Sequence, residues 1–535
     1  MQRHCLTAVI ALTALAPSAA CNDHPIKETE AQSTVVDECT LVVNPSREVD
    51  ILFVIDNSGS MGEEQALLAA NFERFIGVLE EPGVDADYRI AITTTDTGNL
   101  YCPQSDPENG AFVLESCVDR LDEFTSGDDD KSAEACLELC PTSFSGFGTT
   151  PTALVDGGER IARPWIERLG GQPNLPEEMD TVQAFQCFGP QGIAGCGFES
   201  PLEAMYNALL RTKEAGDPAY GFLRKDALLS IVFITDENDC SASPDGAAIF
   251  DPNGDHVFWS DPDAKAPTSA ACWNAGVACD DSGCWSEDYA ADGTATESDA
   301  AVLHPLKRYV DLLLGQIGKD PSQILVSVIA GVPEGYPAEP IVYQASADSE
   351  FQRLYGVGAG CTSATGGTAT PPVRLKEFAD AFAGEEVNLF SICADDYRPA
   401  LESIAERMKQ RFIPACYDGC VADNDLDVDG VQADCAVTET VKGEARSISP
   451  CDETADGGWS MPAGLDICYR VVSGDGIHEQ CKEKLVNTEF KIERAPGVLP
   501  RSGGLIEAEC VLSSNPELEC PGYEVEQDCR ENEEA

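Results

Sequence analysis

The sequence predicts an α/β protein, built on a doubly wound, mostly parallel sheet with long disulfide-stapled insertions and a small β-rich module at the C-terminus. Three observations lead to this prediction. Nearly continuous apolar runs alternate with segments of helical periodicity, which is typical of a sheet covered on both faces. Long stretches rich in Gly, Pro, Asp and Cys separate some of these elements, and nine cysteines fall within the last 120 residues.

The apolar runs are the expected strands. A strand buried on both faces needs apolar residues at nearly every position. Runs of this kind occur at 49–55, 88–95, 228–234, 324–329 and 387–392.

Helical periodicity follows several of these runs. One helix should begin near Glu63 and end at Pro82-Gly83. Ser200-Pro201-Leu202-Glu203 has the pattern of a capping box and should open a helix that runs through Leu210. Further helices are expected over 305–314 and around 401–412.

The domain boundaries follow from these elements. Residues 48–415 should form the α/β domain, interrupted by insertions at about 100–195, 240–300 and 333–372, and residues 416–535 the Cys-rich module. Loops of this length are normally functional or disordered, and the cysteines in them predict lids or subdomains held by disulfides.

The N-terminus resembles an export signal. Residues 1–20 combine an early positive charge, a short apolar run and small residues before Cys21. The ending Ser-Ala-Ala-Cys is similar to the lipobox of bacterial lipoproteins, which implies a lipid on Cys21, although that family prefers Leu where this chain has Ser18. The alternative is an ordinary signal peptide cut near Ala20. Residues 21–47 would then be the lipidated cysteine and a flexible tether.

The cysteine count agrees with lipidation. The chain has 24 cysteines, and removing Cys5 with the signal and Cys21 with the lipid leaves 22, an even number that can pair completely. Zinc knuckles are the alternative for the closely spaced pairs 136/140 and 416/420, but no paired His or second Cys cluster supports a zinc site. We therefore expect disulfides and an oxidising compartment.

The charge excludes some partners. With 34 basic and 94 acidic residues, the formal net charge is −60. Such a polyanion repels nucleic acid and anionic membrane surfaces, so we expect no nucleic-acid partner and membrane contact only through the N-terminal lipid. The same charge attracts divalent cations.

One motif carries candidate chemistry. The run 49–55 ends in Asp56-Asn57-Ser58-Gly59-Ser60, directly before a helix. In open α/β sheets, ligands bind at the carboxyl ends of the strands. A carboxylate and two hydroxyls at alternate positions are hard oxygen ligands, which suit Mg²⁺, Ca²⁺ or Mn²⁺ better than zinc or copper. The alternative is that the serines cap the helix and the aspartate accepts turn amides.

This strand and motif resemble the first loop of the metal-ion-dependent adhesion site of von Willebrand factor type A domains. The resemblance implies that Ser58 and Ser60 contact the metal and that Asp56 acts directly or through water. The family's third loop carries an Asp after the fourth strand, and Asp236 in Ile234-Thr235-Asp236 matches it. Asp96 and the acidic run 236–239 would add negative potential at the same edge.

The second loop departs from the family. Its usual Thr before a helix is absent from the segment 195–200, so we assign the role to Glu199 or Ser200, with Thr149 and Thr150 as more distant candidates. A neutral Thr would leave the cation electrophilic, whereas a Glu ligand would weaken partner capture or hold the cation more tightly. The resemblance covers about 49–415 with interruptions, and the whole chain looks like the Cys-rich lipoproteins of this family in Gram-negative bacteria.

The resemblance implies an exported lipoprotein of the cell envelope, on the outer membrane or cell surface, that binds a protein partner through a carboxylate–metal contact. The alternative is a structural envelope protein in which the cation and the disulfides only stabilise the fold. No enzyme is expected: catalytic motifs are absent, and His256 and His304 have the contexts of surface or capping residues.

A second acidic segment contains Asp425, Asp427 and Asp429 and resembles a calcium loop. An EF-hand would need Glu at its twelfth position, which is Ala436. A loose calcium turn and a solvated acidic linker both remain open.

Overall fold

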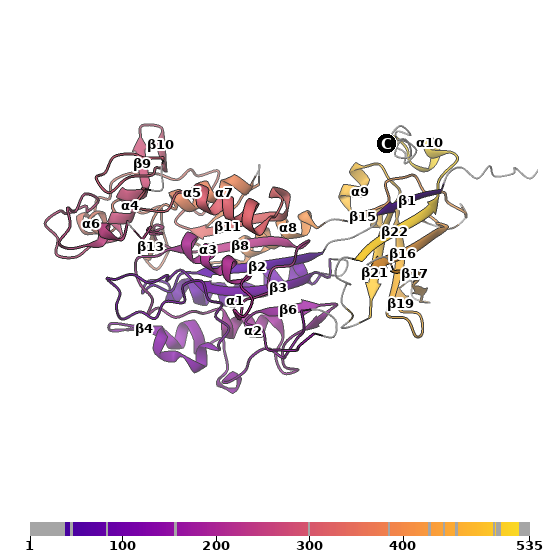
Figure 1. Cartoon of the computed structure of the whole chain (residues 1–535), viewed down its shortest axis with the longest axis horizontal. Helices are drawn as coiled ribbons and strands as arrows, with labels where there is room; N and C mark the ends of the chain where they lie inside the picture. The colour runs from indigo at the N-terminus through magenta and orange to yellow at the C-terminus, as the bar shows by residue number, and fades with distance from the viewer. Residues whose placement is uncertain are drawn as a thin grey trace, which may run out of the picture.

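The structure is a computed structural model. It describes residues 38–42 and 47–523, apart from the short stretches 82–83, 155–157, 245, 298–299, 384–385, 413, 426–427, 429, 442–443, 455–457, 496–497 and 499–503. Figure 1 shows two lobes: an α/β lobe, formed by residues 47–411, and a C-terminal lobe rich in strands.

A seven-stranded sheet in the order β14-β11-β8-β2-β3-β6-β7 forms the centre of the α/β lobe. Five of its strands are parallel: β2 (Glu48–Ile55), β3 (Asp87–Thr94), β8 (Leu228–Ile234), β11 (Ile324–Ala330) and β14 (Leu389–Ser391). Ile55 is paired with Thr94 on one side and with Ile234 on the other, so β2, β3 and β8 end side by side.

Helices cover both faces of this sheet, as the sequence predicts. One face is covered by α1 (Gly62–Leu79), α2 (Thr181–Phe188) and α8 (Arg398–Arg411), and the other by α3 (Pro201–Arg211), α5 (Leu306–Asp311) and α7 (Val373–Ala383). The side chains of β2 alternate between two clusters: Phe53 and Ile55 pack under α1, whereas Leu52 and Val54 pack under α3. The sheet is therefore buried on both sides, which explains its continuous apolar runs.

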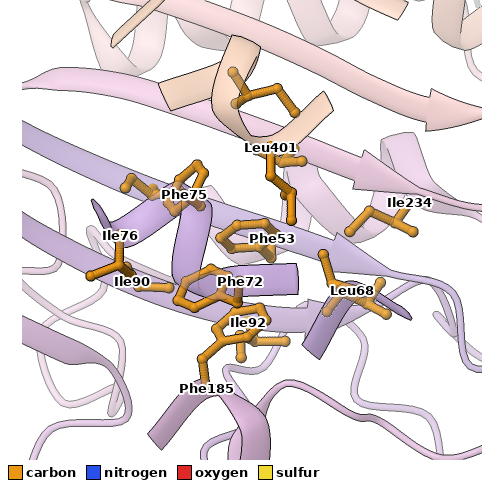
Figure 2. Packing of buried hydrophobic residues seen from close by; sticks show 14 of the residues in the cluster. Phe53, Leu68, Phe72, Phe75, Ile76, Ile90, Ile92, Phe185, Ile234 and Leu401 are labelled. Carbon is orange, nitrogen blue, oxygen red and sulfur yellow. The ribbon is translucent and has the colours of Figure 1, made fainter. Parts of the chain in front are cut away.

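Aromatic rings form the core between β2, α1 and α2 (Figure 2). Phe72 stacks on Phe185 with the ring centroids 3.5 Å apart and an interplanar angle of 6°. Phe53 meets Phe72, Phe75 and Phe185 at centroid distances of 6.0, 5.7 and 5.2 Å. Aromatic pairs of this kind contribute about 0.5–1.5 kcal/mol each beyond the area they bury. This core holds α1 against the strand that ends in Asp56.

The expected insertion at 100–195 does more than cover the sheet. It contributes the antiparallel edge strands β6 (Ile166–Leu169) and β7 (Gln172–Pro173), as well as α2. Short hairpins and helices in the insertions were not predicted individually; they are β4 (Thr125–Ser126), β5 (Asp129–Asp130), α4 (Ala270–Gly276), β9 (Val277–Asp280), β10 (Gly283–Ser286), α6 (Ser349–Tyr355), β12 (Cys361–Thr362) and β13 (Thr368–Ala369).

Disulfides staple the insertions and the C-terminal lobe, as expected. The described pairs are 102–196, 117–136, 140–187, 240–272, 279–284, 361–393, 416–481, 420–520, 435–510 and 451–468. Each cysteine of the closely spaced pairs 136/140 and 416/420 bonds to a distant cysteine, so these residues are not zinc ligands. Such extensive cross-linking is consistent with an exported protein.

The C-terminal lobe contains a second seven-stranded sheet, in the order β1-β22-β16-β17-β20-β21-β15. Its members are β1 (Glu38–Val42), β15 (Ala415–Cys416), β16 (Cys435–Val441), β17 (Glu444–Pro450), β20 (Ile467–Ser473), β21 (Thr488–Arg494) and β22 (Gly504–Val511). The lobe also contains β18 (Asp452–Glu453), β19 (Trp459–Ser460), α9 (Glu479–Glu483) and α10 (Pro516–Glu519).

The N-terminal strand β1 belongs to this second lobe. Residues 38–42, which we expected within the flexible tether 21–47, pair antiparallel with β22, and β1 is the dark indigo strand among yellow ones in Figure 1. Backbone pairing with a neighbouring strand therefore orders a segment that has no apolar periodicity of its own. The signal 1–20, Cys21 and residues 21–37 lie outside the described residues.

None of the helices within the described ranges is long and apolar enough to cross a membrane.

Candidate cation-binding site

The candidate site lies where β2, β3 and β8 end. The amide of Asp56 donates to the carbonyl of Ile234 at 2.9 Å, and the amide of Thr95 donates to the carbonyl of Ile55 at 3.2 Å. These bonds continue the parallel ladder by one residue beyond each strand. They bring the residues after β2, β3 and β8 together, although these are far apart in the sequence.

Asp56 is fully buried at the centre of this edge. Its Oδ1 accepts the amide of Ser58 at 2.8 Å, and its Oδ2 accepts the hydroxyl of Thr235 at 2.6 Å. Burial raises the pKa of the Asp56 carboxyl, although these hydrogen bonds oppose the rise. Asp56 therefore does accept a turn amide, as the non-metal alternative requires, and also reaches the loop after β8.

The two serines do not cap α1. The residue before that helix is Met61, and it makes no side-chain capping bond. Ser58 is buried and Ser60 is exposed, and their hydroxyl oxygens lie 3.3 Å apart. Ser60 is also within hydrogen-bonding reach of the Asp236 carboxylate. The helix-capping alternative is thus wrong for both serines, and Ser60 is the solvent-facing member of the set.

Asp236 contributes a buried carboxylate from the loop after β8. Its Oδ1 has no hydrogen-bond partner, and its backbone carbonyl accepts the amide of Thr370 at 2.8 Å. Burial, together with the nearby carboxylates of Asp56 and Glu237, raises the pKa of Asp236 well above its usual value. A positive charge beside this unpartnered oxygen would stabilise the ionised form of the carboxylate.

Glu199 comes from the loop before α3, as predicted. It is fully buried, and its Oε2 accepts the hydroxyl of Thr95, while its Oε1 has no partner. The Asp56 carboxyl lies close to it. Burial and the charge of Asp56 raise the pKa of Glu199 well above its usual value.

The other candidates for the second loop lie elsewhere. Ser200 donates to the carbonyl of Cys240 at 3.1 Å, and Thr149 donates to the carbonyl of Arg163 at 2.6 Å. The amide of Thr150 donates to the carbonyl of Asn174 at 2.7 Å, beside the edge strands. Of the proposed replacements for the family's Thr, only Glu199 directs a side chain to the site.

The predicted capping box at the start of α3 is wrong. Ser200 makes no capping bond, and the amide of Glu203 donates instead to the hydroxyl of Ser241 at 3.0 Å. The Glu203 carboxylate pairs with Arg308 at 2.8 Å. A residue from the next insertion therefore caps this helix, which no local sequence pattern could reveal.

Neighbouring groups hold the loops of the site in place. The Gln65 side chain bridges them: its Nε2 donates to the carbonyls of Asp56 and Gly192, each at 2.8 Å, and its Oε1 accepts the amide of Gln191 at 2.7 Å. Gly195 packs so closely that a Cβ would lie 2.2 Å from Oδ1 of Asn57. The loop from β2 and the loop carrying Glu199 are therefore in tight contact.

Asp96 supports the site rather than offering free oxygens. Its Oδ1 accepts the amide of Gly98 at 2.8 Å and its Oδ2 the amide of Cys196 at 3.0 Å. Cys196 is bonded to Cys102. The disulfide and Asp96 together attach the loop before Glu199 to the end of β3.

Two threonines that were not predicted, and Glu237 from the acidic run 236–239, also belong here. Thr95 and Thr235 donate hydroxyls to Glu199 and Asp56, and Glu237 is buried beside them with its carboxylate accepting the Ser269 hydroxyl at 2.7 Å. Burial and the charge of Asp56 raise the pKa of Glu237 to about 8. The position of each threonine directly after a strand was the available signal.

The donor atoms at this site suit a hard cation, but the carboxylates alone are not arranged to hold one. The unpartnered oxygens of Glu199 and Asp236 are buried, and hydroxyls and carboxylates are the donors that Mg²⁺ and Ca²⁺ prefer. However, no group of three or more His, Cys, Asp and Glu side chains in the described part of the chain is arranged to hold a metal ion. A cation here would therefore depend on Ser58 and Ser60 as well as on the carboxylates.

The second candidate loop is only partly described. Asp427 and Asp429 lie outside the described residues. Asp423 Oδ1 accepts the amides of Asp425 at 3.0 Å and Gln432 at 3.1 Å, which closes a turn around this segment. Calcium binding by Asp425, Asp427 and Asp429 stays a prediction.

Comparison with known proteins gives little further guidance. No family model and no curated protein matches the chain. Among solved structures, the chain is similar to the pilus adhesin SpaC from Lactobacillus rhamnosus GG in its open conformation, with 8% identity and a TM-score of 0.26, over 90% of this chain and 40% of that one. Another form of the same adhesin matches with 9% identity and a TM-score of 0.26, over 88% and 40%. The chain thus spans less than half of these adhesins, and the likeness is too low to carry an argument.

Proposed function

We propose that this chain is an exported binding protein of the von Willebrand factor type A kind, anchored in the bacterial cell envelope by a lipid on Cys21. In this proposal the α/β lobe holds Mg²⁺ or Ca²⁺, or alternatively Mn²⁺, and uses it to bind a carboxylate of a protein partner. The carrying observation is that Glu199 and Asp236, from separate loops, direct unpartnered buried oxygens to the edge that contains Asp56.

The residues that would hold the cation are Asp56, Ser58, Ser60, Glu199 and Asp236. The cation would supply a positive charge and a coordination position for an external carboxylate. The chain's own residues supply the rest: Thr95 and Thr235 orient two of the carboxylates by donating to Glu199 and Asp56. Ser60 is the exposed member, so a partner would approach from its side.

The proposal is a binding protein rather than an enzyme. The described histidines of the α/β lobe are engaged elsewhere, since His256 stacks on Trp259 and His304 lies 3.8 Å from Glu203. Asp56 and the carboxylates around it have threonine and serine hydroxyls as neighbours, not a base–nucleophile pair.

The test is thermal melting of the protein with Mg²⁺, with Ca²⁺ and with chelator. We expect a cation that binds at this site to raise the melting temperature of the wild type and to have little effect on that of Ser60→Ala. This substitution removes an exposed hydroxyl without opening a cavity. Ser282→Ala is a matched control, because Ser282 is also an exposed serine, and its hydroxyl donates to the carboxylate of Asp280. A cation response that Ser60→Ala retains in full would refute this assignment of the site.

One observation favours the second candidate function, a structural cation site. Asp56, Ser58 and Asp236 are exposed by only 0%, 2% and 7%, which leaves little room for a partner's carboxylate. The two candidates differ in one outcome. If the cation raises the melting temperature but the same envelope proteins copurify in cation and in chelator, the cation only stabilises the fold.

A further inference from the structure

A loop in the insertion at 240–300 closes around the His256 ring. The imidazole Nδ1 lies 2.8 Å from the carbonyl oxygen of Pro262, and its Nε2 lies 3.0 Å from the carbonyl oxygen of Pro252. The two prolines are on either side of the histidine, so one ring joins the two ends of the loop. The backbone of His256 is left-handed, with φ of 54°.

Both partners of this ring are hydrogen-bond acceptors. A neutral imidazole has one N–H donor and one lone pair, whereas the imidazolium has two donors. In the neutral form, one ring nitrogen would therefore direct its lone pair at a carbonyl oxygen. The observed arrangement is satisfied only by the protonated ring.

The surroundings also favour the cation. The His256 ring stacks on the Trp259 indole, with centroids 3.8 Å apart and an interplanar angle of 4°. A positive charge over an indole face is stabilised by the ring quadrupole. Trp259 is itself held in place, because its Nε1 donates to the carbonyl of Ile249 at 2.7 Å.

The charged groups around the ring are mainly acidic. Asp251 faces it, and its carboxylate accepts the amide of Asn253 at 2.9 Å and the hydroxyl of Tyr101 at 3.5 Å. Asp255, Asp261 and Asp263 are on the same loop, and Asp261 also interacts with Arg353 of α6. The two carbonyl acceptors and the Asp251 charge raise the pKa of His256, which is consistent with the geometry.

We propose that His256 is a proton-dependent clasp that closes the loop 251–263. The loop packs toward the candidate site through its aromatic residues. Phe258 and Trp259 share a cluster with Phe250, and the Phe250 ring meets that of Phe198 at 4.8 Å, next to Glu199. Opening the clasp loosens the aromatic cluster that packs against Phe198, the residue before Glu199. The clasp itself requires no cation, so it is independent of the function proposed above.

The sign follows from the direction of the pKa shift. The folded state holds the proton more tightly than the unfolded chain, so the clasp stabilises the loop fully below the unfolded pKa of about 6.5. This stabilisation is lost as the pH rises through the higher folded pKa. The loop is closed in mild acid and opens in mild alkali.

The first measurement is a histidine NMR titration of the full protein carrying ¹³C-labelled histidine. His256→Asn identifies the signal, because Asn tolerates positive φ, donates to one carbonyl and does not titrate. We expect the His256 signal to titrate above 6.5. A pKa at or below the ordinary histidine value overturns the proposal.

The second measurement is hydrogen exchange of peptides from 249–266 in wild type and variant. Because the substitution removes one of the two hydrogen bonds that the charged ring donates, His256→Asn should speed exchange on the order of tenfold at pH 5.5 and by much less at pH 9. A ratio that does not change with pH overturns the proposal. His304→Asn is the matched control, since burial lowers the pKa of His304 and its effect on stability has the opposite sign.

Discussion

Asp236→Asn should stabilise the protein in the absence of a cation and reduce the stabilisation that a cation provides. In chelator, the wild-type carboxylate is buried, has an unpartnered Oδ1 and lies close to Asp56 and Glu237. An unsatisfied buried polar group costs about 1–3 kcal/mol, more when it is charged. Because the amide is neutral, we expect the variant to be more stable than the wild type by about 1–3 kcal/mol in chelator at pH 8.

In saturating cation this advantage should shrink or disappear. A ligand at 100 times its dissociation constant stabilises the folded state by about 2.7 kcal/mol. If the substitution weakens cation binding about 100-fold, the same concentration stabilises the variant by only about 0.4 kcal/mol. The cation-induced gain is therefore smaller by about 2 kcal/mol in Asp236→Asn, which offsets most or all of its advantage in chelator.

The assay is urea unfolding at pH 8, in chelator and in 10 mM Mg²⁺ or Ca²⁺, for wild type, Asp236→Asn and the exposed control Asp122→Asn. The reasoning is refuted if Asp236→Asn and wild type gain equally from the cation. It is also refuted if the variant is less stable than the wild type in chelator, because the buried carboxylate would then be a stabilising group.

Two further predictions concern the core and the helix beside the site. Phe72→Ala removes the ring that stacks on Phe185 at 3.5 Å and should lower the free energy of unfolding by about 3–5 kcal/mol in urea unfolding, whereas a loss under 1 kcal/mol would contradict the packing described above. Burial raises the pKa of Glu64 from 4.5 to about 7, so in chelator this carboxyl alone should contribute a loss of about 3 kcal/mol of stability as the pH rises from 4.5 to 7, because it ionises more readily in the unfolded chain. Glu64→Gln should flatten this dependence, and an unchanged pH profile in the variant would show that another group causes it.

The elements that could be predicted most exactly are the strands buried on both faces, because their continuous apolar runs follow from that burial. The run 228–234 is β8 to the residue, and the run 49–55 differs from β2 only in that β2 begins at Glu48. Shorter or mixed patterns were less exact. The expected strand 387–392 is reduced to Leu389–Ser391, since pairing with β11 covers only that length.

Helix ends were harder to predict than helix positions. The segment 305–314 forms α5 only to Asp311, and Leu312–Ile317 continues as a π-helix that ends at the left-handed Gly318. The helix α7 was not predicted, although it covers one face of the sheet with Leu375 and Phe378. Its apolar residues are interleaved with charges, and only contact with the sheet decides that they are core.

The candidate site could be predicted where its residues directly follow strands in the sequence. Asp56 and Asp236 come after two strong apolar runs, and parallel neighbouring strands end at the same edge, so their proximity was expected and is observed. Glu199 was one of several candidates for the second loop. The choice between it and Ser200 depends on side-chain direction, which the order of residues does not report.

By itself, the sequence determined the alternation of strands and helices, the acidic character of the chain and the loops that carry Asp56 and Asp236, because burial and local periodicity are written in consecutive residues. Only the tertiary structure decided which cysteines pair, that β1 joins the C-terminal lobe, and that Glu199, Thr95 and Thr235 surround Asp56. Each of these depends on contacts between segments distant in the chain, whose energies come from the packing and pairing of the folded state and not from any local pattern.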